Sequence, residues 1–437
     1  MDLPRRTIVV VIISALTFVG VILSVLFAKP VKVFNIKLEL YYIVALIGAV
    51  LVLIFGGVNA GEVLNTFLEN TPVNPIKILV LFICMTLLSV FLDEMGFFRY
   101  MATVTLKKSG SSQKKLFLYL YIIVSVLTVF TSNDVIVLSF TPFLCYFCKS
   151  AKINPIPYLS AEFIASNTFS MMLIIGNPTN VYLASAFGVN FLDYLMVMFF
   201  PTLLSGITAF LVLYLIFKKQ LQLQISVSEE NYVIKDKFLY VVALVHLIVT
   251  TVMLAVSSYV NIEMWLVSLV AVISLTTVTL IVSLIRKQKP NSLLKAFKGA
   301  PWQLIPFVIS MFVLVTALHQ SGITKTFSDT LSGGNEVISY GVASFLSSNV
   351  INNIPMSVLF SKIIEHGAGV GAFYASVIGS NLGAYLTPIG ALAGIMWHTL
   401  LKVHGVKYGY VDFVRTGAEV SIPTLIVALI TLSLFVI

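Results

Sequence analysis

Long apolar runs limit the folds open to this chain more strongly than its other sequence features do. Several reach about 20 residues, which is the length that an α-helix needs to cross the hydrocarbon core of a bilayer. Hydrophobic residues make up 59% of the chain and charged residues only 10%, whereas soluble domains average about 25% charged residues. The alternation of apolar and polar residues that marks an outer-membrane β-strand is absent from the sequence. We therefore expect an all-α polytopic membrane protein.

The formal net charge of +9 does not indicate a nucleic-acid partner. Lys and Arg lie in short loops between apolar runs, where the positive-inside rule places them. The sequence contains no phosphate-binding loop and no large soluble domain, so we expect neither ATP hydrolysis nor another enzymatic activity. Cys145 and Cys148 have CxxC spacing, but no second Cys or His pair accompanies them, and we interpret them as packed membrane cysteines. Arg5 and Arg6 precede an apolar run without a small-residue cleavage site, which favours a retained first helix over a signal peptide.

Stretches in the second half of the chain repeat stretches in the first half. ASNTFSMMLIIGNPTN, from Ala165, aligns without gaps with GSNLGAYLTPIGALAG, from Gly379. TSND, from Thr131, aligns with SSNV, from Ser347, at nearly the same spacing along the chain. Upstream, DEMGFF resembles HQSGIT, with Gly96 opposite Gly322 at a slightly larger spacing. Spacings close to half the length of the chain predict an internal duplication.

The charges of the loops predict that the two repeats have opposite orientations. Residues 57–76 contain no Lys or Arg, whereas the equivalent residues 286–301 contain five. The next loop reverses the contrast, because residues 94–115 contain five and residues 320–337 contain only Lys325. Equivalent loops on opposite sides of the membrane indicate an inverted-topology repeat, which is common in secondary transporters. Counting the spans back from these loops places the N-terminus outside. Arg5 and Arg6 disfavour this orientation, because the positive-inside rule would place them in the cytoplasm. Lys29, Lys32 and Lys37 in the next loop would then be inside, and they narrowly outweigh the two arginines.

The expected membrane path has the same order in both halves. Each half contains three spanning helices, one re-entrant hairpin and two further spans, which gives ten spans and two hairpins in total. The first repeat covers residues 1–217, the second covers 238–437, and a polar cytoplasmic linker at 218–237 joins them. The expected spans are 7–28, 40–56, 77–93, 157–186, 192–217, 238–258, 263–285, 302–319, 372–402 and 416–436, and the hairpins are 115–150 and 337–364.

Polar residues gather in four clusters within these apolar segments. Two are the expected hairpin tips, at Thr131–Asp134 and Ser347–Asn353. In the second cluster we expect the tip at Ser348–Asn349 and the outgoing arm to start at Asn352 and Asn353. The other two clusters are breaks in the spans 157–186 and 372–402, where Gly and Pro disfavour a continuous helix. Irregular backbone at membrane depth is tolerated where protein or a watery cavity satisfies it. Its N–H groups suit an anion or a polar solute, and its carbonyl, hydroxyl and amide oxygens suit Na⁺. The candidate binding residues are Ser132, Asn133, Asp134, Asn167, Thr168, Gly176, Asn177, Pro178, Thr179, Asn180, Ser348, Asn349, Asn352, Asn353, Ser380, Asn381, Thr387, Pro388 and Gly390.

These clusters resemble the ion transporter superfamily. The motifs that carry the resemblance are SNDVIVLSFTPF, SNTFSMMLIIGNPTN, SSNVINNIPM and GSNLGAYLTPIG. The superfamily includes arsenite permeases, NhaD-type Na⁺/H⁺ antiporters and divalent anion/Na⁺ symporters. The resemblance implies an elevator-type transporter, in which a transport domain carrying both hairpins moves against a scaffold. By family analogy it also implies a homodimer and, for some members, a soluble ATPase partner.

Within the superfamily, the chain is most similar to the arsenite and anion permease branch. Dicarboxylate symporters carry Ser-Asn-Thr at both tips, whereas this chain has Ser-Asn-Asp from Ser132 and Ser-Asn-Val from Ser348. The Ser-Asn-Asp tip followed by Thr141-Pro142, and the Gly-Asn-Pro-Thr-Asn segment from Gly176, resemble the arsenite branch. The resemblance implies transport of a small oxyanion or its neutral acid, coupled to H⁺ or Na⁺, across a prokaryotic plasma membrane. A Na⁺-coupled di- or tricarboxylate symporter, a Na⁺/H⁺ antiporter, an ion channel and an intramembrane enzyme are the alternatives.

Two carboxyl groups stand out within the apolar segments. A carboxylate at midplane depth costs at least about 2.5–3.5 kcal/mol on insertion scales. We therefore interpret Asp134 as the coupling residue, which binds Na⁺ or carries a proton; the alternative is a cap at a half-helix N-terminus. Glu162 is either a gating or proton-carrying residue or a solvated interfacial one. Because the four clusters contain no Lys or Arg, they favour a neutral solute such as arsenous acid, or an anion bound together with cations. We expect no cofactor, and no metal other than Na⁺.

Overall fold

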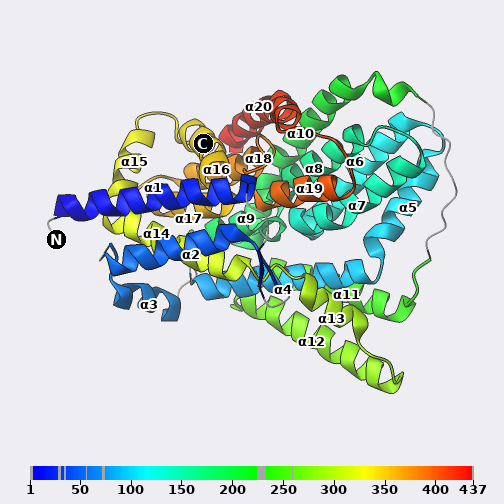
Figure 1. Cartoon of the computed structure of the whole chain (residues 1–437), viewed down its shortest axis with the longest axis horizontal. Helices are drawn as coiled ribbons and strands as arrows, with labels where there is room; N and C mark the ends of the chain where they lie inside the picture. The colour runs from blue at the N-terminus through cyan, green and yellow to red at the C-terminus, as the bar shows by residue number, and fades with distance from the viewer. Residues whose placement is uncertain are drawn as a thin grey trace.

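The computed structural model describes residues 3–27, 31–33, 36–55, 57–70, 74–223, 233–257 and 259–435 (Figure 1). Apart from one short antiparallel hairpin, in which Val31 pairs with Leu38, the elements are helical. Lys29, Glu229 and Glu230, which contribute to the expected topology and linker, lie outside the described residues.

The first half contains α1 (Leu3–Phe27), β1 (Val31–Val33), β2 (Ile36–Leu38), α2 (Leu40–Ile54), α3 (Ala60–Leu68), α4 (Pro75–Glu94), α5 (Phe97–Ser109), α6 (Gln113–Phe130), α7 (Asn133–Ser150), α8 (Ile156–Phe169), η1 (Ser170–Met172), η2 (Ile174–Gly176), α9 (Pro178–Ala186), α10 (Phe191–Phe217) and η3 (Gln220–Gln222). The second half contains α11 (Lys237–Val256), α12 (Met264–Ile285), α13 (Asn291–Gly299), α14 (Leu304–Gln320), α15 (Ile323–Leu331), α16 (Glu336–Ile351), α17 (Asn353–Ile364), α18 (Val370–Gly383), α19 (Leu392–Val403) and α20 (Tyr410–Phe435).

Among the described residues, eight helices are long and apolar enough to cross a membrane. Seven correspond to expected spans, and the eighth is α6, which the sequence interpretation placed in a hairpin. The other three expected spans do not qualify, because α2 has only 15 residues and the spans 157–186 and 372–402 are broken into shorter helices. The sequence interpretation also left four short helices as loops, namely α3, α5, α13 and α15.

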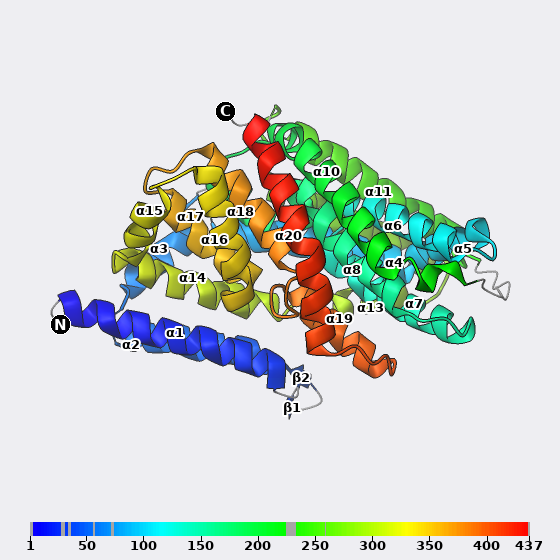
Figure 2. The ribbon, with the colours of Figure 1, turned by 90° about the horizontal axis from the view of Figure 1, so that it is seen from above.

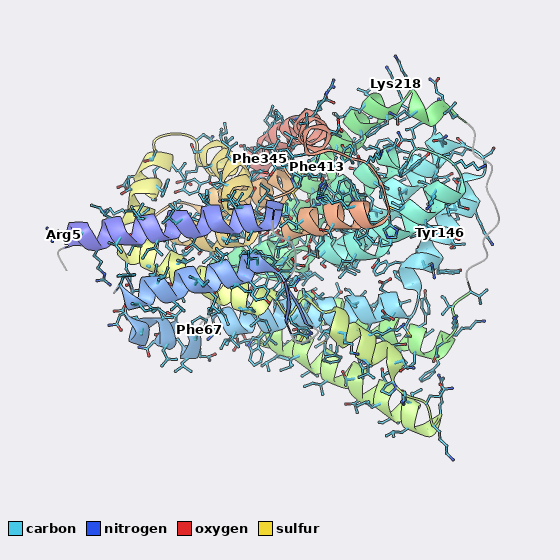
Figure 3. The ribbon with its side chains drawn as sticks, viewed as in Figure 1. Arg5, Phe67, Tyr146, Lys218, Phe345 and Phe413 are labelled. Atoms are coloured by element: carbon cyan, nitrogen blue, oxygen red, sulfur yellow. The ribbon has the colours of Figure 1, made fainter. Side chains whose placement is uncertain are left out.

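Apolar side chains divide between the interior of the molecule and its outer surface. Phe345 and Phe413 are buried near the middle, whereas Arg5, Tyr146 and Lys218 lie at the periphery (Figure 3). The outer helices expose large apolar residues, for example Leu16 on α1, Ile248 on α11 and Leu284 on α12. Exposed apolar faces of this extent suit lipid contact rather than water, which agrees with the expected membrane protein.

The two halves of the chain pack against each other in reciprocal pairs. Helix α2 packs against α14, and α12 packs against α4; likewise α7 packs against α19, and α17 packs against α9. The long helices α10 and α20 pack against each other. The α6–α7 and α16–α17 hairpins lie on opposite sides of the centre along the long axis, with α8, α18 and α20 between them (Figures 1 and 2).

The tip of the second hairpin differs from the sequence prediction. The break between α16 and α17 lies at Asn352, whereas Ser348 and Asn349 lie inside α16, so the predicted tip at Ser348–Asn349 is wrong by about one helical turn. Asn352 has φ 71° and ψ 154°, a strained conformation that residues with a Cβ rarely adopt. In the first hairpin, the turn is at Thr131 and Ser132, and Asn133 and Asp134 begin α7.

Small residues let α16 and α18 approach closely. A Cβ added to Gly379 would lie 1.9 Å from Ser344 Oγ and 2.4 Å from the carbonyl oxygen of Gly341. One turn later, a Cβ on Gly383 would lie 2.1 Å from Ser348 Oγ. Glycines one turn apart are a recurrent means of bringing membrane helices into contact. Ser348 therefore packs at a helix crossing rather than at a hairpin tip.

Replacing Gly379 with Ala should destabilise the protein, because the added methyl group requires backbone displacement at the α16–α18 crossing. We expect a loss of about 1–3 kcal/mol, measured as a lower temperature of thermal unfolding in detergent. Gly333→Ala is the matched control, because its Cβ would approach no atom closer than 3.9 Å. Equal unfolding temperatures for the two variants would contradict the close packing described above.

Candidate functional site

The candidate site is built around two interrupted helices, one from each half. In the first half, α8 gives way to two short 3₁₀ turns before α9 begins at Pro178. In the second half, α18 ends at Gly383 and α19 begins at Leu392. Helices α8 and α18 have 14 residues each, and the alignment of the two repeats places Ile156, which begins α8, opposite Val370, which begins α18. The breaks therefore occupy corresponding places in the two halves.

Sequence chemistry explains the first break. Pro178 is the first residue of α9, where its missing N–H is no loss because a first-turn N–H has no helical partner. Asn177 caps this helix by accepting the backbone N–H of Thr179 at 3.2 Å. Gly176 lets the two 3₁₀ turns pack closely, because a Cβ at this position would lie 2.1 Å from the carbonyl oxygen of Ser170.

Asn381, on α18, joins the two breaks. Its Oδ1 accepts hydrogen bonds from Ser170 Oγ at 2.8 Å and from Asn177 Nδ2 at 3.0 Å. Its Nδ2 donates to Asn180 Oδ1 at 2.7 Å. All four side chains are fully buried. A buried polar group without a partner costs about 1–3 kcal/mol, so this set of bonds holds the two halves in register.

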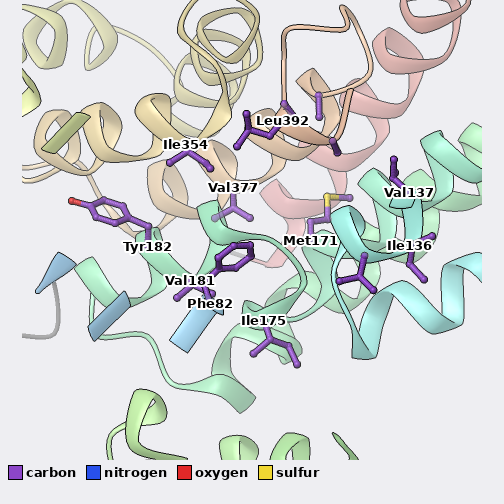
Figure 4. Close-up of a cluster of buried hydrophobic side chains, with 14 of the residues drawn as sticks. Phe82, Ile136, Val137, Met171, Ile175, Val181, Tyr182, Ile354, Val377 and Leu392 are labelled. Carbon is purple, nitrogen blue, oxygen red and sulfur yellow. The ribbon is translucent and has the colours of Figure 1, made fainter. Parts of the chain in front are cut away.

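Further polar contacts and an apolar shell surround Asn381. Thr179 Oγ1 lies 3.1 Å from Ser380 Oγ, which adds a second link between the breaks. Met171, Ile175, Val181 and Val377 pack nearby from both halves (Figure 4). Low-polarity surroundings strengthen each hydrogen bond and raise the cost of losing one.

The first hairpin brings an amide and a carboxyl group to this region. Ser132 caps α7 by accepting the N–H of Val135 at 3.4 Å. Asn133 Nδ2 donates to Asn167 Oδ1 at 3.0 Å, but its own buried Oδ1 has no hydrogen-bond partner among the described residues. Ser132, not Asp134, is therefore the capping residue, and the Asn133 oxygen is left free to accept.

The second hairpin ends in an equivalent arrangement. Asn352 caps α17 by accepting the N–H of Ile354 at 3.4 Å, and its Nδ2 donates to the carbonyl of Ile389 at 2.9 Å. The N–H of Asn353 donates to the carbonyl of Gly390 at 3.0 Å. Asn353 Oδ1 is buried and, like Asn133 Oδ1, is unpaired within the described ranges. Asn133 and Asn353 each begin the outgoing helix of their hairpin.

Asn349 is not the tip residue that its alignment with Asn133 predicted. It lies inside α16, and its Oδ1 accepts from the N–H of Thr387 at 3.1 Å and from Thr387 Oγ1 at 2.7 Å. It thus ties an arm of the second hairpin to the second break, beside Pro388. It corresponds neither to Asn133 nor to a tip residue, because Asn353 occupies that place.

Asp134 borders a cavity of about 210 Å³. Its neighbours in the lining include Thr86, Gln303 and a second carboxyl residue, Glu39, and no lining residue is basic. Asp134 is 8% exposed. Its carboxyl group makes no hydrogen bond or ion pair with another side chain in the described part of the chain. The cavity therefore suits a cation, a proton or an uncharged solute better than an isolated anion.

Two residues of the site carried no sequence signal that we used. Ser170 lies in the first break and joins Asn381. Tyr385 lies just after α18, where its hydroxyl group accepts from Thr168 Oγ1 at 3.3 Å. Ser170 lies inside the motif SNTFSMMLIIGNPTN and Tyr385 inside GSNLGAYLTPIG. Their position within these motifs could have identified them as site residues.

Comparisons with known proteins agree with this architecture. The family model described as "Citrate transporter" (CitMHS) matches residues 40–373, which is more than half of the chain. The chain belongs to the citrate transporter family. It is therefore a membrane transporter rather than an enzyme, and it is a multi-pass protein of the plasma membrane. The expected resemblance to the ion transporter superfamily is confirmed.

Relatives of this transporter include proteins named for arsenicals. An "Arsenical pump membrane protein" of Escherichia coli is 26% identical over 373 residues, which cover 81% of this chain and 85% of that protein. A "Putative arsenical pump membrane protein" of Bacillus subtilis is 25% identical over 407 residues, which cover 85% and 89% of the two chains.

Solved structures resemble the fold alone. The YdaH transporter of Alcanivorax borkumensis superposes with a TM-score of 0.57 at 12% identity, over 98% of both chains. MtrF of Neisseria gonorrhoeae superposes with a TM-score of 0.51 at 14% identity, over 99% of this chain and 95% of that one.

Replacing Asn381 with Ala should destabilise the transporter more than any exposed Asn substitution. The change removes the partner of Asn177 Nδ2 and weakens the pairing of Ser170 and Asn180. We expect a loss of about 2–4 kcal/mol, measured by thermal unfolding. Asn65→Ala is the matched control, because Asn65 is exposed on α3. An equally small effect for both would show that Asn381 does not hold the breaks together.

Proposed function

We propose that this chain is a secondary active transporter that moves a small oxyanion or its neutral acid, coupled to a H⁺ or Na⁺ gradient. The observation that carries the proposal is the meeting of two helix breaks through Asn381, with a hairpin tip from each half beside them. Broken helices that meet inside a membrane protein present N–H groups and oxygens to a solute without exposing them to lipid.

The charges around the site support an uncharged form of the cargo. The predicted binding residues include one carboxyl group, Asp134, and no basic residue. Its cavity adds a second acidic residue, Glu39. An oxyanion would enter this cavity against two carboxyl groups, whereas a neutral hydroxylated acid such as arsenous acid would hydrogen-bond to the amides. The E. coli and B. subtilis relatives named for arsenicals support the same cargo class.

The unpaired amide oxygens support coupling to a cation. Asn133 Oδ1 and Asn353 Oδ1 are buried acceptors in equivalent places, and oxygen ligands near helix breaks suit Na⁺. The two places are unequal, because the next residue is Asp134 in the first half and Ile354 in the second. A site beside Asp134 would accept either Na⁺ or a proton, whereas one beside Ile354 has no ionisable neighbour in the same position.

We further propose alternating access by an elevator movement between two inverted repeats, as the family resemblance implies. The reciprocal pairing of α2 with α14 and of α12 with α4 supports a scaffold that both halves share. Each hairpin and broken helix would move together as the transport domain. The opposite charges of equivalent short helices support inverted orientation, because α3 contains Glu62 and no Lys or Arg, whereas α13 contains Lys295 and Lys298. A homodimer and a soluble ATPase partner are further proposals that rest on family resemblance.

A Na⁺-coupled di- or tricarboxylate symporter is the second candidate. The name of the matching family model, citrate transporter, favours it. A tricarboxylate would need its charge balanced by bound cations, since the candidate residues supply no Lys or Arg.

Flux measurements in proteoliposomes distinguish the two candidates. The purified protein is given an imposed pH or Na⁺ gradient, and arsenite, citrate, succinate and sulfate are tested in turn. We expect gradient-driven arsenite flux that exceeds the citrate flux. Citrate flux driven by Na⁺ with no arsenite flux would favour the second candidate. Currents above about 10⁶ ions per second would identify a channel, because alternating access is far slower than that.

Asp134→Asn should abolish gradient-driven flux and leave the fold intact. The amide keeps the size of the side chain but neither binds a transferable proton nor attracts Na⁺ by charge. Coupled flux and thermal unfolding are measured on the same preparation, with Asp329→Asn as the control because Asp329 is an exposed acid on α15. Normal coupling in the Asp134 variant would remove this residue from the coupling mechanism.

A further inference from the structure

A second carboxyl group, that of Glu162 on α8, is sealed inside the protein away from the cavity that Asp134 borders. Glu162 is fully buried, so the interpretation of it as a solvated interfacial residue is wrong. It contacts the outgoing arm of the first hairpin through Thr141, and a helix of the other half through Trp397. Three helices, α7, α8 and α19, therefore meet at one carboxyl group.

The contacts of Glu162 fit a neutral carboxylic acid. Thr141 Oγ1 lies 3.1 Å from Oε1 and 3.2 Å from Oε2, and Trp397 Nε1 donates to Oε2 at 3.2 Å. A hydrogen bond from a hydroxyl group to an ionised carboxylate is shorter, at about 2.5–2.7 Å. In the neutral form, Oε1–H donates to the Thr141 hydroxyl group and Oε2 accepts from the indole.

The surroundings give a negative charge no compensation. Trp397 packs with ring centroids 5.0 Å from Phe163, 5.6 Å from Phe413 and 5.8 Å from Tyr408, forming an aromatic wall. The nearby ionisable group on α7 is the buried thiol of Cys145. Within the residues that the structure describes, no Lys, Arg or His forms an ion pair with Glu162. An unpaired buried carboxylate costs several kcal/mol.

The second half shows that packing of this kind does not require an acid. In the alignment of α8 with α18, the residue opposite Glu162 is Ser376, whose hydroxyl group donates to the carbonyl of Ala372 at 2.8 Å. In the alignment of α7 with α17, the residue opposite Thr141 is Ser361, which donates to the Tyr182 hydroxyl group at 3.4 Å. Neutral hydroxyl groups occupy the equivalent places there. The carboxyl group is thus a special feature of the first half.

We propose that Glu162 is a proton-binding site, distinct from Asp134, and that its neutral acid links α8 to the first hairpin through Thr141 and to α19 of the other half through Trp397. Loss of this proton leaves an uncompensated negative charge beside Trp397 and the aromatic side chains that pack on it. The Thr141 hydroxyl group then donates to the carboxylate instead of accepting from the acid. The cost of burying this charge opposes the packing of α7 and α19 around Glu162. Glu162 acts as a positioning residue, because it borders neither the cavity nor the two helix breaks.

Infrared spectroscopy of the purified protein tests the proton directly. We expect the wild-type protein to show, at neutral pH, the C=O stretching band of a protonated carboxylic acid that exchanges slowly in D₂O. Glu162→Gln should lack this band. Glu419→Gln is the control and should retain it, because Glu419 is an exposed residue paired with Arg415 on α20.

Thermal unfolding of three Glu162 variants supplies an independent readout. Glu162→Gln should unfold close to the wild-type temperature, because a neutral amide donates to Thr141 and accepts from Trp397 as the acid does. Glu162→Ala and Glu162→Asp should unfold earlier, because the first lacks both bonds and the second does not span the distance. Absence of the band in the wild type, or a Gln variant as unstable as the Ala variant, would overturn the proposal. Neither readout depends on the cargo, so its failure is distinguishable from failure of the proposed function.

Discussion

The buried amide of Asn381 is the contact on which both broken helices rely. Two helices of this protein are broken inside a membrane, where water does not satisfy their free backbone groups. Hydrogen bonds from Asn381 to Ser170, Asn177 and Asn180 satisfy side chains of the first break from the second half of the chain. Because unpaired buried amides are costly, neither break is stable without the other. This mutual requirement brings α8 and α9 against α18 and positions the hairpin tips beside them.

The two halves follow similar paths but differ in chemistry. Each capped hairpin tip has a buried amide oxygen, on Asn133 and on Asn353, that makes no hydrogen bond within the described residues. Ionisable groups inside the protein nevertheless concentrate in the first half, where Asp134 borders the cavity and Glu162 is sealed away from it. One ionisable carboxyl group is enough to make cargo movement depend on an ion. When the group binds or releases that ion, its charge changes, and so does the free-energy cost of moving it through the membrane interior.

The second hairpin shows the limit of aligning the two repeats by residue identity alone. Matching Ser-Asn pairs aligned Asn133 with Asn349. The helix boundaries instead align Asn133 with Asn353, about one helical turn later, because each begins the outgoing helix behind a capping side chain. Polar residues recur so often in this stretch that identity alone does not choose between registers. The sequence correctly predicted that the outgoing arm starts at Asn352 and Asn353. That Asn352 caps this helix, and that α16 continues through Ser348 and Asn349, is decided by the folded chain.

Local sequence was enough to establish the membrane class, seven of the spanning helices and the places of both broken helices. Bilayer thickness and the properties of Pro and Gly act locally along the chain, which is why these features could be predicted. Which of these residues meet was settled by the packing of the folded chain. It joined Asn381 to the first break, separated Asn349 from the tip and enclosed Glu162 behind Trp397. These contacts join residues that are distant along the chain, and two of the three join its opposite halves. They depend on which helix faces pack together, which no local pattern specifies.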